Sequence, residues 1–205
     1  KIMHGLFPFL KTFVFIVVCF WSVGCASSPP TQFYLLSPLP APDHETTDTQ
    51  DRRPTIIRLD AVVIPGYLDR PEIVTRISEN EIHLADLNQW GEPLRGNLTN
   101  ILAVNLSRLL PAERFAIFPF KCPSPIDYQI TIEIVQMDGS LDGAVHLVAQ
   151  WSILQGKEDN ILVTRKSRFK AKKTPTDYDE LVGAQSLLVE ALSREIAESI
   201  QAKLN

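Results

Sequence analysis

Cysteine and histidine are scarce in this chain of 205 residues, which contains three cysteines and four histidines. None of them stands at the close spacing that zinc or iron–sulfur sites require, so we expect no metal site. Glycine-rich phosphate-binding loops, the nucleophile elbow of hydrolases and the helical zinc-protease motif are absent as well. The sequence therefore predicts no cofactor and no catalysis, and a hydrolase with a dispersed site is the alternative among enzymes.

A strong charge of either sign is also missing, because 20 basic residues stand against 24 acidic ones and the net charge is −4. This balance argues against nucleic acid as a partner, since nucleic-acid binding depends on an excess of positive charge. Hydrophobic residues make up 45% of the chain and charged residues 21%, which is typical of a globular protein. The length suits one domain with a substantial core.

The chain contains no hydrophobic run long enough to cross a bilayer. The most apolar stretch, residues 12–24, has thirteen residues, whereas a spanning helix needs about 20. It follows the basic residues Lys1 and Lys11 and leads into small residues before Cys25, which is the layout of a secretory signal peptide. We therefore expect residues 1–24 to be a signal peptide. A signal cleaved elsewhere, or an uncleaved anchor, is the alternative.

The end of this segment, Ser22-Val23-Gly24-Cys25, resembles a bacterial lipobox, apart from serine where leucine is usual. We therefore expect Cys25 to carry fatty acids such as palmitate. Several acyl chains together anchor a protein stably to a membrane. By the same resemblance, Ala26 in place of aspartate directs the protein to the outer membrane, facing the periplasm. Residues 25–32 would then form the tether, and residues 33–205 a single domain. Cys122 would be the remaining free thiol.

The remaining sequence predicts strands and helices in a clear order. Two long amphipathic helices are expected at residues 93–110 and 177–204, the second capped by Thr176 or Asp177. Alternating apolar residues predict strands at residues 33–36, 57–65, 73–78, 81–84, 114–118, 128–134, 145–153 and 161–171. The expected fold class is α/β, an α+β sandwich in which a mixed, largely antiparallel sheet packs against the two helices. Trp90 and Trp151 are expected in its core.

Basic residues are concentrated near the end of the last expected strand. Lys166, Arg168, Lys170 and Lys172 stand at alternate positions, so a strand would point all four the same way. Such a stripe could contact lipid phosphates, lipopolysaccharide or an acidic partner. The alternative is a solvated sheet face, or an edge strand protected by charge.

A second candidate contact surface is the loop that follows the second strand. It places an aromatic and an aliphatic residue between turn formers and comprises Pro65, Gly66, Tyr67, Leu68, Asp69 and Arg70. Loops of this composition often contact partners. Folding back onto the core is the alternative.

Several segments, in order and spacing, resemble the ABC-type transport auxiliary lipoproteins, the PqiC-like group. They are QFYLLS at 32–37, PGYLDRPEIV at 65–74, WGEPL at 90–94, Asn105-Leu106 with Leu109-Leu110-Pro111, Trp151 and YDELV at 178–182. The resemblance covers almost the whole chain after Cys25. It implies an α/β sandwich and a role as a partner protein without catalysis.

The resemblance further implies a place in an envelope transport system. Such lipoproteins act with MCE-domain proteins, which move lipids between membranes with energy from an ABC transporter and support envelope integrity. The chain would be the docking element at the outer membrane, with an MCE-domain protein as its partner and a homo-oligomer as a possible assembly. The alternative function is a lipid- or glycolipid-binding carrier with an apolar cavity between helices and sheet.

Overall fold

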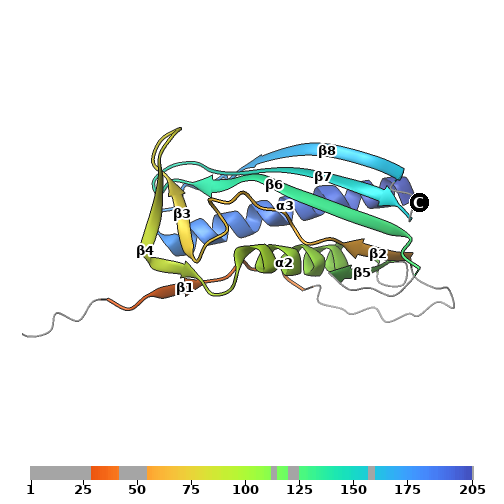
Figure 1. Cartoon of the computed structure of the whole chain (residues 1–205), viewed down its shortest axis with the longest axis horizontal. Helices are drawn as coiled ribbons and strands as arrows, with labels where there is room; N and C mark the ends of the chain where they lie inside the picture. Colours follow the sequence, from red (N-terminus) through yellow and green to blue (C-terminus); the bar gives the residue numbers. More distant parts are fainter. Residues whose placement is uncertain (1–28, 42–54, 112–114, 120–124, 157–159, 205) are drawn as a thin grey trace, which may run out of the picture. The chain divides into compact units, whose positions relative to one another are not determined.

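The computed structural model describes residues 29–41, 55–111, 115–119, 125–156 and 160–204 (Figure 1). Cys25, Ala26, Cys122 and the expected signal peptide lie outside these ranges, so the predictions about them stay predictions. The chain divides into two compact units, Lys1–Pro30 and Thr31–Asn205. The fold described below is that of the second unit.

In the described ranges, eight strands form two sheets. The larger sheet has the order β5-β2-β6-β7-β8, and the smaller has the order β1-β4-β3. Parallel pairs join β5 to β2, β2 to β6 and β1 to β4, whereas β6-β7-β8 and β3-β4 are antiparallel. The bounds are β1 Gln32–Tyr34, β2 Thr55–Leu59, β3 Glu72–Arg76, β4 Ile82–Trp90, β5 Phe115–Pro119, β6 Tyr128–Gly139, β7 Val145–Gln155 and β8 Asn160–Lys170. The antiparallel meander expected from the alternation is confirmed.

Two helices, α2 (Leu94–Leu109) and α3 (Tyr178–Leu204), pack against each other and cover one face of the larger sheet (Figure 1). The longer helix, α3, lies against β6, β7 and β8, while α2 lies against β5. The expected stripe of α3 is fully or nearly fully buried: Leu181, Ala184, Leu188, Leu192 and Ile196. Trp90 and Trp151 are core residues, as predicted. The predicted α+β sandwich with a mixed sheet is confirmed.

The start of α3 is set by local side-chain chemistry. Asp177 accepts a hydrogen bond from the backbone N–H of Glu180 at 2.8 Å, which satisfies one of the free donors at a helix start. The Glu180 carboxylate in turn accepts the backbone N–H of Thr176 at 2.9 Å. Of the two caps expected from sequence, Asp177 is therefore the one whose side chain caps the helix.

The predicted strand at residues 57–65 is wrong in its second half. Regular β2 ends at Leu59, which pairs with Ile130, and the chain next bridges β6 at Val63, opposite Glu133. Four residues on one side therefore match three on the other. This extra residue reverses the alternation, so Val62 and Ile64 are buried whereas Ala61 and Val63 are exposed.

A second irregularity corrects the prediction for β8. Ile153 pairs with Val163, but the next β7 residue, Leu154, pairs with Ile161. The additional β8 residue turns Ile161 outward, and its side chain is 60% exposed. Phe169 and Ala171 lie partly buried on the helix side, as expected.

Buried polar side chains of α2 hold the irregular segment after β1 in place. Asn97 Oδ1 accepts the backbone N–H of Leu36, and Asn105 Oδ1 accepts that of Leu39, both at 2.9 Å. Asn105 also donates to Ser193 on α3 at 3.1 Å. Buried backbone donors must be paired, so these two amides fix the chain that leads away from β1.

We expect Asn105→Ala to lower the free energy of unfolding by about 2–3 kcal/mol, because the buried N–H of Leu39 would lose its acceptor. Equilibrium denaturation with urea measures this change. The matched control is Asn100→Ala, at an exposed position of the same helix, which should change stability by about 0.5 kcal/mol or less. Equal effects of the two substitutions would contradict the anchoring role of Asn105.

Candidate functional site

The loop of residues 65–70 folds back onto the core. Its turn is closed by the N–H of Leu68, which donates to Pro65 O at 2.9 Å, and Leu68 is buried. Tyr67 donates its phenolic hydrogen to Asp138 Oδ2 at 2.7 Å. Gly66 and Asp69 are exposed, whereas Pro65 and Arg70 are partly buried. A partner contact through this loop stays a prediction, and the exposed positions are where it could be made.

Asp138, at the end of β6, is the centre of a buried polar cluster. Arg76 of β3 donates to both carboxylate oxygens, with Nε 3.1 Å from Oδ1 and Nη2 2.7 Å from Oδ2. Gln136 donates to Oδ1 at 2.8 Å, and the Arg76 guanidinium lies 6.0 Å from the centre of the Tyr67 ring. The Asp138 cluster (Asp138, Arg76, Tyr67 and Gln136) therefore connects the loop and the smaller sheet to the larger one.

The pKa shifts of these groups agree with a structural role. Burial alone would raise the pKa of Asp138, but hydrogen bonds from Arg76, Gln136 and Tyr67 and the charge of Arg76 lower it overall. Burial, followed by the hydrogen bond to Asp138, raises the pKa of Tyr67 to about 12. Hydrogen bonding to Asp138 raises the pKa of Arg76. The cluster is thus a carboxylate, a guanidinium and a neutral phenol at neutral pH.

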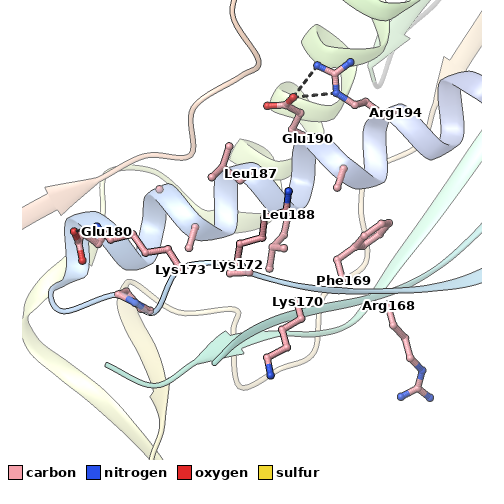
Figure 2. Close-up of a pocket in the computed structure, with 15 residues that line it drawn as sticks. Arg168, Phe169, Lys170, Lys172, Lys173, Glu180, Leu187, Leu188, Glu190 and Arg194 are labelled. Carbon is pink, nitrogen blue, oxygen red and sulfur yellow. Dashed lines mark hydrogen bonds and ion pairs between the residues drawn. The ribbon is translucent and has the colours of Figure 1, made fainter. Parts of the chain in front are cut away.

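A groove lies between the end of β8 and the outer side of α3 (Figure 2). Its volume is about 710 Å³, and we call it the β8–α3 groove. Its apolar lining consists of Phe169, Ala171, Pro175, Gly183, Ala184, Leu187, Leu188 and Ala191. Leu187 is 66% exposed, although large apolar residues are more often buried. The sequence pattern identified only the buried stripe of α3 and did not predict that Leu187 lines a groove. The available signal was that Leu187 is apolar but lies outside that stripe.

Charged residues surround the β8–α3 groove, and some of them form ion pairs. Lys173 forms an ion pair with Glu180, and Arg194 with Glu190 at 2.8 Å. The hydrogen bond from Lys173, together with those from Thr176, lowers the pKa of Glu180 to about 2. Within the part of the chain that the structure describes, no ion pair involves the other lining cations, which are Arg168, Lys170 and Lys172.

The expected stripe of four basic residues is only partly correct. Lys166, Arg168 and Lys170 are exposed on β8, but the strand ends at Lys170, so Lys172 lies beyond it. Figure 2 shows Lys172 extending toward α3, whereas Arg168 and Lys170 extend the opposite way. The alternation that the sequence suggested stops with the strand. Lys166 does not line the groove.

A smaller cavity of about 410 Å³ adjoins the loop of residues 65–70. Its lining includes Asp69, Arg70, Trp90, Glu92 and Leu94, and it shares no residue with the β8–α3 groove. Asp69 pairs with Arg95 of α2 at 2.7 Å, with both side chains about half exposed. The cavity beside the loop of residues 65–70 and the β8–α3 groove are therefore separate sites.

We expect Asp138→Asn to lower the free energy of unfolding by about 2–4 kcal/mol at pH 7, because Arg76 would lose its charged partner. The lowered pKa of Asp138 means that its contribution is complete above the ordinary pKa of 3.8 and is lost as pH falls through the folded-state value. The difference between wild type and variant, measured by denaturation, should therefore shrink in acid. Asp142→Asn, in the exposed turn that follows β6, is the control. A difference independent of pH would contradict this assignment.

Comparisons with known proteins extend over nearly the whole chain. The family model of the ABC-type transport auxiliary lipoprotein component matches residues 34–197. The chain is also similar to the intermembrane transport lipoprotein PqiC of Escherichia coli K12. The two are 26% identical over 192 residues, which cover 94% of this chain and 97% of that protein.

Solved structures share the fold. A crystal structure of an uncharacterised protein superposes with a TM-score of 0.70 at 22% identity, covering 84% of this chain and 99% of the other. That of a Xanthomonas campestris protein has a TM-score of 0.63 at 12% identity, covering 82% and 93%. The family match agrees with the resemblance seen in the sequence, and the chain belongs to the ABC-type transport auxiliary lipoprotein family.

Proposed function

We propose that this protein is a lipoprotein anchored in the outer membrane and facing the periplasm, where it is the docking subunit of an MCE-type ABC transport system. Its task there is to support lipid transport between the membranes. The observation that carries this proposal is the family match over residues 34–197. The similarity to an intermembrane transport lipoprotein over 94% of the chain supports it.

The anchor is assigned to acyl chains on Cys25, with Ala26 as the sorting residue. From Ala26 to Gln32, where β1 starts, the chain has seven residues, which span about 25 Å at most. A folded body on such a short tether stays close to the membrane. Within the described residues, no helix has both the length and the apolar character needed to cross a bilayer.

A binding role without catalysis fits the groups found in the domain. The buried Asp138 and the partly buried Arg76 and Tyr67 satisfy one another and join structural elements. Within the described ranges, no three histidine, cysteine, aspartate or glutamate side chains gather to hold a metal ion. Family membership supports the assignment of an auxiliary subunit.

The alternative, a lipid carrier, is favoured by one observation: the β8–α3 groove is largely apolar. It lies between α3 and the edge strand of the larger sheet, so it opens at the border of the helix–sheet interface where the carrier hypothesis expected a cavity. Native mass spectrometry after gentle purification separates the two functions. A carrier retains a lipid in stoichiometric amount, whereas a docking subunit does not.

We expect the wild-type protein to incorporate radiolabelled palmitate and to fractionate with the outer membrane. Cys25→Ala should abolish labelling and release the domain from the outer membrane, because the acyl chains supply the anchoring energy. Ala26→Asp should keep the label and move the protein to the inner membrane. Cys122→Ala is the control and should behave as wild type. Labelling that persists in Cys25→Ala would refute the anchor.

We expect capture of the protein from detergent-solubilised envelopes to recover an MCE-domain protein. Mass spectrometry of the captured material measures this. Because the proposed contact is made by the folded domain, Asp138→Asn, which weakens the fold, should reduce recovery, whereas Asp142→Asn should not. Repeated recovery of no MCE protein with an intact lipoprotein would contradict the proposed partner.

A further inference from the structure

Among the residues that the structure describes, no strand pairs with the outer edge of β8, so this edge of the larger sheet leaves backbone groups unpaired. β8 is the last strand in the order β5-β2-β6-β7-β8. In an antiparallel pair, successive residues direct their N–H and C=O groups alternately toward the partner strand and away from it. The pairing with β7 therefore decides which β8 residues present these groups at the free edge.

The hydrogen bond from the N–H of Ala171 to Val145 O, 2.9 Å long, fixes this alternation. Phe169, opposite Leu147, has the same phase as Ala171 and turns its backbone groups toward β7. Arg168 and Lys170 have the other phase. Their backbone N–H and C=O groups therefore face away from β7, at the side where another strand could add.

Side chains alternate across the sheet in the same segment. Figure 2 shows Phe169 pointing toward α3, while Arg168 and Lys170 point to the opposite side. Residues 168–173 form one wall of the β8–α3 groove, and α3 forms the other with Gly183, Leu187 and Leu188. A strand added to this edge would place alternate side chains in the apolar groove and the others beside the two cations.

We propose that the free edge of β8 binds an extended peptide segment of a partner protein, in which apolar residues alternate with acidic ones. The apolar side chains fill the β8–α3 groove, beside Phe169 and Leu187. The acidic side chains lie next to Arg168 and Lys170, which have no ion-pair partner among the described residues. Backbone pairing supplies affinity, and the alternating pockets and charges supply specificity.

Positive charge on an edge strand selects among possible occupants. Lysine and arginine on an edge discourage pairing with basic strands and with purely apolar ones. The same cations attract a strand whose side chains on that face are acidic. This inference rests on the proposed function, because it names the surface through which a docking subunit binds a protein partner.

The test uses the full chain, purified in detergent, and an eight-residue peptide of alternating valine and glutamate as the probe. Fluorescence anisotropy measures binding, and hydrogen exchange resolved at single amides locates it. We expect the amides of Arg168 and Lys170 to exchange rapidly without peptide and to become protected with it. The amides of Phe169 and Ala171 are expected to be protected in both states, because they pair with β7.

Two pairs of variants separate charge from shape. Lys170→Glu should weaken binding about fivefold at low ionic strength, whereas Lys203→Glu, the same charge reversal near the end of α3, should leave it unchanged. Gly183→Phe should weaken binding at least about tenfold by filling the groove. Gly96→Phe on α2 is its control. A Cβ at either glycine meets no atom within 4 Å, so neither position excludes a side chain, and circular dichroism checks that both variants are folded.

The proposal is overturned if peptide binding leaves the exchange of Arg168 and Lys170 unchanged, or if a valine–lysine peptide binds equally well. Binding to phosphatidylglycerol vesicles without binding to the peptide would also overturn it, in favour of a membrane surface. The proposal is also overturned if, without peptide, these amides become protected as the protein concentration rises, because a second copy of the chain would then occupy the edge. The peptide assay needs no envelope component, so its failure leaves the capture of an MCE-domain protein as a separate result.

Discussion

The arrangement of the two sheets depends on one buried carboxylate. Asp138 is fully buried at the end of β6, and an unpaired charge at such a position would cost several kcal/mol. Arg76 pays this cost from β3, and Tyr67 adds a hydrogen bond from the loop that follows β2. The two sheets have no strand in common. The charge pair therefore requires the smaller sheet, the loop and β6 to be in place together.

The parts of the fold that could be predicted are those with one dry face and one wet face. The predicted parts of β6 and β7 and the helix α3 have such faces, and their buried residues follow the expected periods, whereas β8 departs from its period at Ile161. The reversal between Leu59 and Val63 could not be predicted, because the extra residue is set by the hydrogen bonds that β6 offers. Asn97 and Asn105 interrupt an apolar stripe, and only their tertiary partners explain why they are buried.

The candidate site likewise has one part that could be predicted from the sequence and one part that could not. Exposure of Lys166, Arg168 and Lys170 follows from alternation within one strand and was predictable. The β8–α3 groove was not, since it depends on how far α3 lies from the strand edge and on two α3 residues, Gly183 and Leu187, that no local period identifies. The loop of residues 65–70 had two interpretations from composition. The burial of Leu68 and the hydrogen bond from Tyr67 to the distant Asp138 show that it folds onto the core.

The two edges of the larger sheet are protected by different means, and the difference bears on what can bind. The edge strand β5 has five residues and ends in Pro119, which has no N–H to donate to an added strand. The edge strand β8 has eleven residues and no proline, and its exposed side chains near the groove are cations. A short strand with proline blocks any added strand, whereas charge blocks only strands of the wrong charge. The β8 edge can therefore be both safe from aggregation and open to an acidic partner segment.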